Sequence, residues 1–152
     1  MIVVGYTAGA FGRACLEQGI EHARLRNTEL LVISAVSEAR GQRMVDADEI
    51  AAVTRRLDAS GVKYRLDQPI GATPAEELLT AMDRPDAELL IIGMRRRSQV
   101  GKLLLGSTSQ FLLIECDKPV LVVKPDEARH HRHPPGPSPT DLDSPPRSSL
   151  TD

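Results

Sequence analysis

Aromatic residues are nearly missing from this sequence of 152 residues, in which Trp is absent and Tyr and Phe occur twice each. A buried core therefore has to be built from aliphatic side chains. Cysteine is also scarce, because Cys15 and Cys116 are too few for the disulfide framework of a small secreted domain. Both lie in apolar periodic segments, which predicts two buried free thiols.

Long apolar runs and a strong excess of one charge are missing as well. No stretch approaches the roughly 20 apolar residues that span a bilayer. The segment after Met1 lacks the basic region and the apolar run of a signal peptide. The net charge of −2 argues against bulk attraction to nucleic acid or anionic lipid. We therefore expect a cytoplasmic protein that binds neither nucleic acid nor membrane.

The composition changes after Pro125. Residues 126–152 are rich in Pro, Ser and charge and nearly free of aliphatic side chains, which predicts a disordered tail. His130, His131 and His133 in this tail could bind a metal or simply belong to a flexible polar segment. The second interpretation is favoured, because no Cys or carboxylate framework fixes a ligand geometry. Residues 1–125 are the single predicted domain.

Residues 1–125 alternate short aliphatic runs with segments of helical periodicity. The predicted strands cover residues 1–6, 29–36, 62–67, 87–93 and 118–125, and the predicted helices cover 10–26, 46–60, a segment that starts at 73, and 107–115. This alternation predicts right-handed crossovers and a parallel sheet with helices on both faces. Such a sheet binds ligands beyond the carboxyl ends of its strands, where the strand order reverses.

The segment GMRRRSQVGKLLLGS, residues 93–107, lies at one of these carboxyl ends. Gly106 and Ser107 open a predicted helix, whose free N–H groups and dipole favour anions. Hydroxyl donors come from Ser107 and Thr108, and four cations fall between residues 95 and 102. Guanidinium groups match phosphate oxygens well. These features predict a phosphate site.

A plain basic turn remains the alternative for this segment. The chain contains neither G-x-x-x-x-G-K-[ST] nor G-x-G-x-x-G, so no established phosphate fingerprint supports the site. Exposed turns are often basic, and glycine is common where a strand ends. The pattern of residues alone leaves both interpretations open.

The sequence resembles the universal stress protein family over essentially all of residues 1–125. The resemblance rests on IVVGYTA near the start, GMRRRSQVGKLLLGSTSQ from Gly93, and CDKPVLVVKP from Cys116. It implies an open five-stranded parallel sheet of order 3-2-1-4-5, which is the adenine nucleotide alpha hydrolase-like three-layer sandwich, similar to a Rossmann fold. It also implies a homodimer, often formed through the last strand, here Pro119 to Lys124.

The ATP-binding branch of that family carries G-x2-G-x9-G-[ST]. Gly93, Gly106 and Ser107 match the first, third and fourth positions of this motif, whereas Arg96 replaces the second glycine. The guanidinium of Arg96 could supply a phosphate ligand in place of the backbone contact.

The adenosine end of the implied site also departs from the family pattern. Tyr6 replaces the Asp that follows the first strand, and Ala35 matches the position whose backbone meets adenine. Tyr6 could stack on the base or sugar, or it could be a partly buried tyrosine that covers the sheet edge.

The function implied by the resemblance is binding of ATP or another adenine nucleotide, with Mg²⁺ accompanying the nucleotide, in a stress-response role. The predicted nucleotide-binding residues are Tyr6, Thr7, Ala35, Gly93, Met94, Arg95, Arg96, Gly106, Ser107 and Thr108. The alternative is a dimerisation or protein-interaction module of the same fold that binds no nucleotide.

A dedicated enzyme is disfavoured, because no nucleophile, base and orienting group fall into a recognisable set. His22 lies on the charged side of its helix, where a solvated role is expected. Asp46, Asp48 and Glu49 resemble a carboxylate cluster but are better explained as favourable charges in the first turn of a helix. Slow ATP hydrolysis is the most that could accompany binding.

Overall fold

The computed structural model describes residues 1–34, 46–69, 71, 73–96 and 103–124. Ala35 and the predicted tail, with its three histidines, lie outside the described residues. The elements in chain order are β1 (Ile2–Gly5), α1 (Ala10–Arg26), β2 (Leu30–Ile33), α2 (Ala47–Asp58), β3 (Tyr64–Asp67), α3 (Pro74–Met82), β4 (Leu89–Gly93), β5 (Arg95–Arg96), β6 (Leu103–Leu104), α4 (Ser107–Glu115) and β7 (Val120–Val123).

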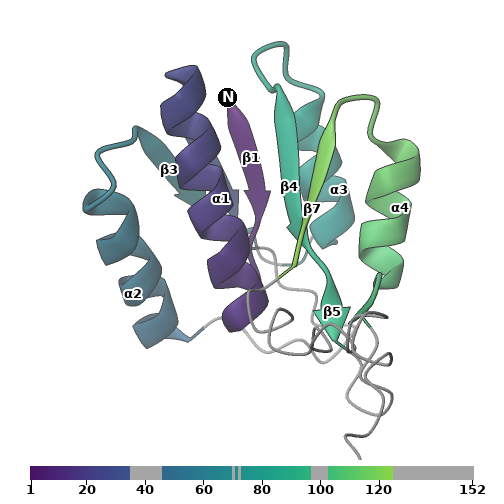
Figure 1. Ribbon diagram of the computed structural model, residues 1–152. Helices are drawn as coiled ribbons and strands as arrows, with labels where there is room; N and C mark the ends of the chain where they lie inside the picture. The colour runs from purple at the N-terminus through teal and green to yellow at the C-terminus, as the bar shows by residue number, and fades with distance from the viewer. Residues whose placement is uncertain (35–45, 70, 72, 97–102, 125–152) are drawn as a thin grey trace, which may run out of the picture.

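The main sheet has five parallel strands in the order β3-β2-β1-β4-β7, which confirms the predicted order 3-2-1-4-5. β1 is the central strand, and its Val3 is in register with Leu31 of β2 and Leu90 of β4. The chain returns from β3 to β4 on the far side of β1, so the strand order reverses between β1 and β4. The carboxyl ends of these two strands point toward the lower edge of Figure 1.

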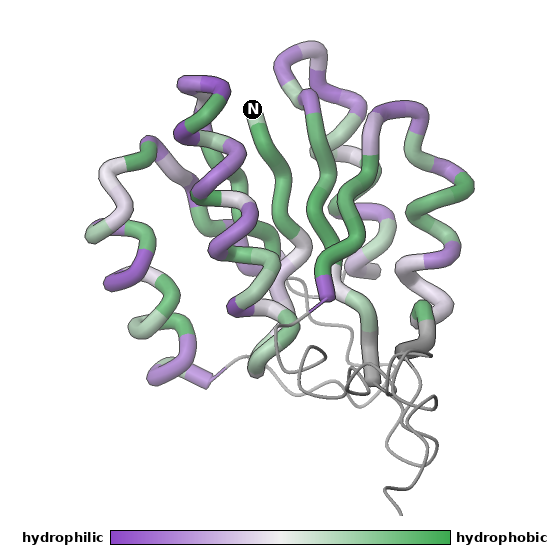
Figure 2. The backbone as a smooth tube through the Cα atoms, viewed as in Figure 1, coloured by the Kyte–Doolittle hydropathy of each residue, from purple (hydrophilic) through white to green (hydrophobic). Residues whose placement is uncertain are grey.

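Two apolar clusters attach the helices to opposite faces of the sheet, which gives the predicted three layers. Alternate residues of the strands, such as Val4 and Val32, pack against α1 and α2. The residues between them, such as Val3 and Leu31, pack against α3 and α4. The inner strands β1, β2 and β4 are therefore apolar on both faces, and β1 and β4 appear as continuous green in Figure 2.

Helix starts follow the local sequence closely. Thr73 caps α3 by accepting a hydrogen bond from the N–H of Glu76 at 3.3 Å, and Pro74 occupies the first turn. Asp46 caps α2 in the same way, with its Oδ1 atom 2.8 Å from the N–H of Glu49. The predicted helix start at residue 73 is thereby confirmed.

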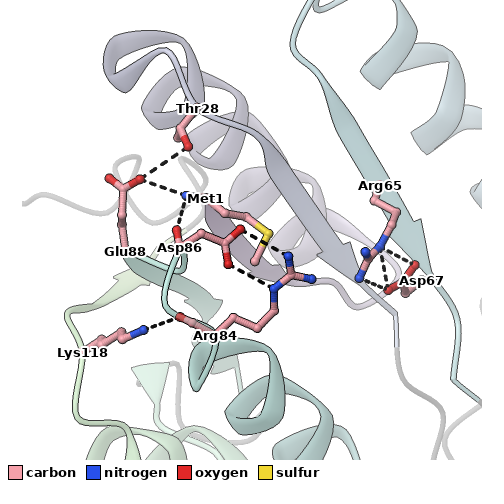
Figure 3. A network of polar contacts seen from close by, with 8 residues as sticks. All are labelled: Met1, Thr28, Arg65, Asp67, Arg84, Asp86, Glu88 and Lys118. Atoms are coloured by element: carbon pink, nitrogen blue, oxygen red, sulfur yellow. Dashed lines mark hydrogen bonds and ion pairs between the residues drawn. The ribbon is translucent and has the colours of Figure 1, made fainter.

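A polar network ties the amino ends of the strands together (Figure 3). The ammonium group of Met1 lies 2.9 Å from Glu88 Oε1, which also accepts a hydrogen bond from the Thr28 hydroxyl at 3.4 Å. Lys118 donates to the carbonyl oxygen of Arg84 at 2.6 Å. These contacts link β1, β2, β4 and β7 at the end of the sheet opposite the predicted site.

Two features differ from the sequence-based expectations. The antiparallel pair β5–β6 was not predicted, because strands of two residues show no alternation. Cys15 is 1% exposed as expected, whereas Cys116 is only partly buried. In α4, Leu112 is buried, but Phe111 and Ile114 are 46% and 78% exposed.

In the described part of the chain, no helix has both the length and the apolar character needed to cross a membrane.

Candidate functional site

A cavity of about 80 Å³ lies where the strand order reverses, between the carboxyl ends of β1 and β4. Its walls come from the turn after β1, the end of β4 and the first turns of α3 and α4. The lining residues are Gly5, Tyr6, Thr7, Phe11, Ile33, Pro74, Leu78, Ile92, Gly93, Met94, Thr108, Ser109 and Leu112. An open α/β sheet binds its ligands at this kind of position.

The structure brings five of the predicted residues together around this cavity: Tyr6, Thr7, Gly93, Met94 and Thr108. Gly106 and Ser107 lie directly before Thr108, at the start of α4, without lining the enclosed space. Arg95 and Arg96 form strand β5, immediately after Met94. Ala35 was predicted at the adenine end and falls outside the described residues.

Tyr6 continues β1 and is held at both its backbone and its side chain. Its N–H donates to the carbonyl oxygen of Ile33 at 2.9 Å, and its hydroxyl donates to Glu49 Oε1 at 2.6 Å. The side chain is 3% exposed and belongs to the apolar cluster beneath α1 and α2. This burial supports the packing interpretation of Tyr6, in which the aromatic ring forms part of the protein interior.

Glu49 joins the start of α1 to the start of α2. Besides the Tyr6 hydroxyl, Glu49 Oε1 accepts the N–H of Gly9 at 3.3 Å and pairs with the Arg13 guanidinium at 3.3 Å. The hydrogen bond from Tyr6 is the main cause that lowers the pKa of Glu49. Burial, followed by the same bond, raises the pKa of Tyr6. The pair is therefore a neutral phenol bonded to a carboxylate at neutral pH.

The start of α4 has the features of an anion site. Its N-cap residue is Gly106, which offers no side chain to cap the helix, and no acidic residue occurs in its first turn. The Ser109 hydroxyl lies 3.4 Å from the carbonyl oxygen of Gly93, which connects the helix to the end of β4. The dipole of α4 therefore points its positive end toward the cavity edge.

Sequence reasoning missed three polar residues near this edge. Glu49 was assigned only to the first turn of α2, since nothing in its spacing reveals a contact with Tyr6. Ser34, at the end of β2, is 1% exposed, and its hydroxyl has no hydrogen-bond partner among the described residues. A buried unpaired hydroxyl is uncommon in proteins. Ser109 could have been found, because it follows the predicted Ser107 and Thr108 on the same turn.

The cavity is smaller than the roughly 300–1,000 Å³ that is usual for small-molecule sites. Two larger spaces exist elsewhere in the described structure. One of about 350 Å³ lies between α1 and α2. The other, of about 590 Å³, lies at the amino end of the sheet beside Arg24, Asn27 and Lys63. The first cavity is selected by its position and not by its size, because it alone of these three described cavities lies at the carboxyl ends where the strand order reverses.

The described side chains form no cluster that would mark a metal site. No three of their His, Cys, Asp and Glu side chains come together in an arrangement that could hold a metal ion. Cys15 lies below Gly93, where an added Cβ would be 3.2 Å from its sulfur. Burial raises the pKa of Cys15 to about 12, so the thiol stays protonated and unreactive at neutral pH.

Comparison with known proteins gives one consistent result. The family model described as the universal stress protein family matches residues 1–124. A universal stress protein of Mycolicibacterium smegmatis is 57% identical over 130 residues, which cover 82% of this chain and 98% of that protein.

Two solved structures share the fold. One is a universal stress protein of Archaeoglobus fulgidus in complex with dAMP, with a TM-score of 0.61 and 20% identity, covering 81% of this chain and 96% of that one. The other is a universal stress protein in complex with cAMP, with a TM-score of 0.60 and 24% identity, covering 80% and 94%. At these identities the likeness concerns the fold, which is the adenine nucleotide alpha hydrolase-like sandwich.

Proposed function

Because the chain belongs to the universal stress protein family, we propose that it binds an adenine nucleotide such as ATP or AMP at the carboxyl end of its sheet. Its role would then be a regulatory one in a stress response. The observation that carries this proposal is the position of the cavity at the reversal of strand order, between the turn after β1 and the start of α4. The dAMP and cAMP complexes of fold relatives support it.

The phosphates would lie over Gly106, Ser107 and Thr108, where the dipole of α4 and the backbone N–H groups favour negative charge. Arg95 and Arg96 follow Met94 in the chain and would add positive charge there. The adenosine would extend toward Tyr6 and Thr7. Since the enclosed space is about 80 Å³, only part of the nucleotide would be enclosed. The rest would lie across the edge past Thr7 and Ser107, which are both exposed.

Titration calorimetry with AMP and with ATP, carried to millimolar nucleotide, tests this proposal. Binding should also raise the melting temperature, because a ligand selective for the folded state stabilises that state. The absence of both calorimetric heat and a thermal shift at millimolar nucleotide would contradict the proposal.

The variant Ser107→Asp locates the phosphate site. A carboxylate at the first position of α4 repels phosphate, so affinity for AMP should fall by roughly tenfold or more, which corresponds to about 1.4 kcal/mol. Gln110→Asp is the matched control, because it adds the same charge to an exposed position one turn further along α4. Equal affinities of Ser107→Asp and wild type would mean that the phosphates bind elsewhere.

We propose that Mg²⁺, if it accompanies the nucleotide, is held mainly by the phosphates. The described residues bring no cluster of three metal-binding side chains to the site. For the same reason, any ATP hydrolysis would be slow. A phosphate-release assay with ATP and Mg²⁺ should give a rate close to that of the buffer alone.

The surface of α4 and β7 supports a second proposal, a homodimer formed through the last strand, Pro119 to Lys124. Phe111, Leu113 and Ile114 of α4 are 46%, 41% and 78% exposed. β7 forms one edge of the sheet. The opposite edge, β3, carries the ion pair Arg65–Asp67 (Figure 3), and charged groups on an edge strand discourage pairing with another chain. This dimer could support nucleotide binding. If the protein binds no nucleotide, dimerisation could itself be the function.

A further inference from the structure

Tyr6 forms part of the wall of two separate cavities. It lines the candidate nucleotide cavity of about 80 Å³ and also the cavity of about 350 Å³ between α1 and α2. Among the described residues, no other one lines both spaces. The first cavity alone is smaller than usual ligand sites, whereas the two spaces joined would fall within the usual range.

The ring of Tyr6 is held firmly in this wall. Its hydroxyl is bonded to Glu49 Oε1 at 2.6 Å, and its side chain is 3% exposed. Glu49 is in turn held by the N–H of Gly9 and by Arg13. Contacts with α1 and α2 hold both Tyr6 and Glu49 in place. Rotation of a single side chain therefore cannot move the Tyr6 ring out of the cavity wall.

The second cavity offers an environment suited to a flat apolar group. Leu16, Ala52 and Val53 supply apolar surface, and the ion pairs Arg13–Glu49 and Arg56–Glu17 also line this cavity. A purine base buries its faces well against such surface and can stack on a guanidinium. In the wild-type chain Tyr6 lines both this space and the cavity proposed for the nucleotide.

We propose that the ring of Tyr6 is the specificity-determining wall of the nucleotide site, which excludes the base from the cavity between α1 and α2. This inference rests on the proposed function and adds to it. The wild-type site encloses little of the base and recognises mainly the sugar and phosphate. Replacing the Tyr6 ring by a smaller side chain joins the two cavities and provides an enclosed pocket for the base.

The test compares AMP with ribose 5-phosphate, which keeps the sugar and phosphate but lacks the base. Calorimetry measures both affinities for wild type and for Tyr6→Val, whose folding is checked by circular dichroism. The preference for AMP over ribose 5-phosphate should rise by about tenfold or more in Tyr6→Val, as expected for enclosing one base. Tyr6→Leu, which retains more volume, should show a smaller rise and serves if Tyr6→Val does not fold.

Leu57→Ala is the matched control, because Leu57 is 0% exposed in the same apolar cluster but lines neither cavity. It should lower stability without raising the preference for AMP. An unchanged preference in folded Tyr6→Val and Tyr6→Leu would overturn the inference. So would a rise in Tyr6→Phe equal to that in Tyr6→Val, because the ring would then not be the determinant.

Failure of the proposed function gives a different result from failure of this inference. If wild type binds no AMP, the proposed function fails for the natural chain, yet Tyr6→Val should still gain measurable AMP binding. If neither protein binds AMP, the inference is overturned as well.

Discussion

The hydroxyl of Tyr6 can be removed without removing its ring, which isolates one bond of the site. In Tyr6→Phe, Glu49 keeps the Gly9 N–H and Arg13 but loses the donor at 2.6 Å. Hydrogen bonds to charged groups contribute about 1.5–3 kcal/mol, so the free energy of unfolding in urea should fall by that amount. Tyr64→Phe is the control. Its lost bond, to Asp58 at the surface, should matter less. Equal losses in both variants would contradict the prediction.

The same bond makes stability depend on pH in a defined direction. The pKa of Glu49 is lower in the folded protein, mainly because of the Tyr6 hydrogen bond. Its contribution is therefore fully present above the unfolded pKa of about 4.3 and is lost as the pH falls through the folded value. The difference in unfolding free energy between wild type and Glu49→Gln should shrink as the pH falls from about 5 to about 3. A difference that stays constant over this range would refute the assignment.

The ring of Tyr6 also shows why the site was only partly predictable. Position 6 was marked by the absence of the family Asp, but two interpretations of the tyrosine remained open. Its burial depends on Glu49, which is 43 positions away in the sequence. No local pattern connects these two residues. The contact exists only because the parallel crossover brings the start of α2 beside the turn that follows β1.

Among the described glycines, those of α1 leave the least room for a side chain. A Cβ added to Gly12 would lie 1.6 Å from the carbonyl oxygen of Thr7, and one added to Gly19 would lie 2.5 Å from a methyl carbon of Val4. The carbonyl oxygen of Thr7 belongs to the backbone and cannot move away from a clash as easily as the Val4 methyl group can. Gly12→Ala should therefore destabilise the protein by at least about 2 kcal/mol, the scale of an overpacked core.

Gly19→Ala is the matched comparison in the same helix, with the same gain in helix propensity of roughly 1 kcal/mol. It should cost clearly less than Gly12→Ala in urea unfolding. Because Thr7 lines the candidate cavity, Gly12→Ala should also weaken nucleotide binding in protein that remains folded. A larger loss of unfolding free energy in Gly19→Ala than in Gly12→Ala would contradict the prediction that the contact between α1 and Thr7 is the tighter one.

The helices and the strands of the main sheet were predictable because each carries its own signal. Most strands of the main sheet are short aliphatic runs, α3 follows its cap residue Thr73, and α2 follows its cap residue Asp46. The strand order was not worked out from these signals. It came from the resemblance, since periodicity does not reveal which strands pair. The hairpin β5–β6 was missed because Arg95–Arg96 and Leu103–Leu104 are too short to show an alternating pattern.

The candidate site was predicted best where it coincides with a helix start or a strand end. Gly93, Met94 and Thr108 line the same cavity because the motif spans the end of β4 and the start of α4. The walls supplied by Pro74 and Leu78 of α3 carried no functional signal, since those residues also serve a cap and the core. Function and packing use the same side chains at these positions.

For the molecule as a whole, the apolar surface of α4 next to the edge strand β7 predicts self-association. Ile114 is 78% exposed in this surface, so Ile114→Asp would place a charge in the proposed interface. Burying an unpaired charge is costly, and the dimer dissociation constant should rise by roughly tenfold or more, measured by sedimentation over a range of concentrations.

Leu25→Asp provides a close control for this experiment. Leu25 is 75% exposed and, like Ile114, is the second-last residue of its helix, but it lies on α1, away from the proposed interface. The added charge and its position relative to the helix dipole are therefore matched. Self-association should be weakened by Ile114→Asp and left unchanged by Leu25→Asp. A wild-type chain that sediments as a monomer at high concentration, or equal effects of the two variants, would show that the α4–β7 surface is not a dimer interface.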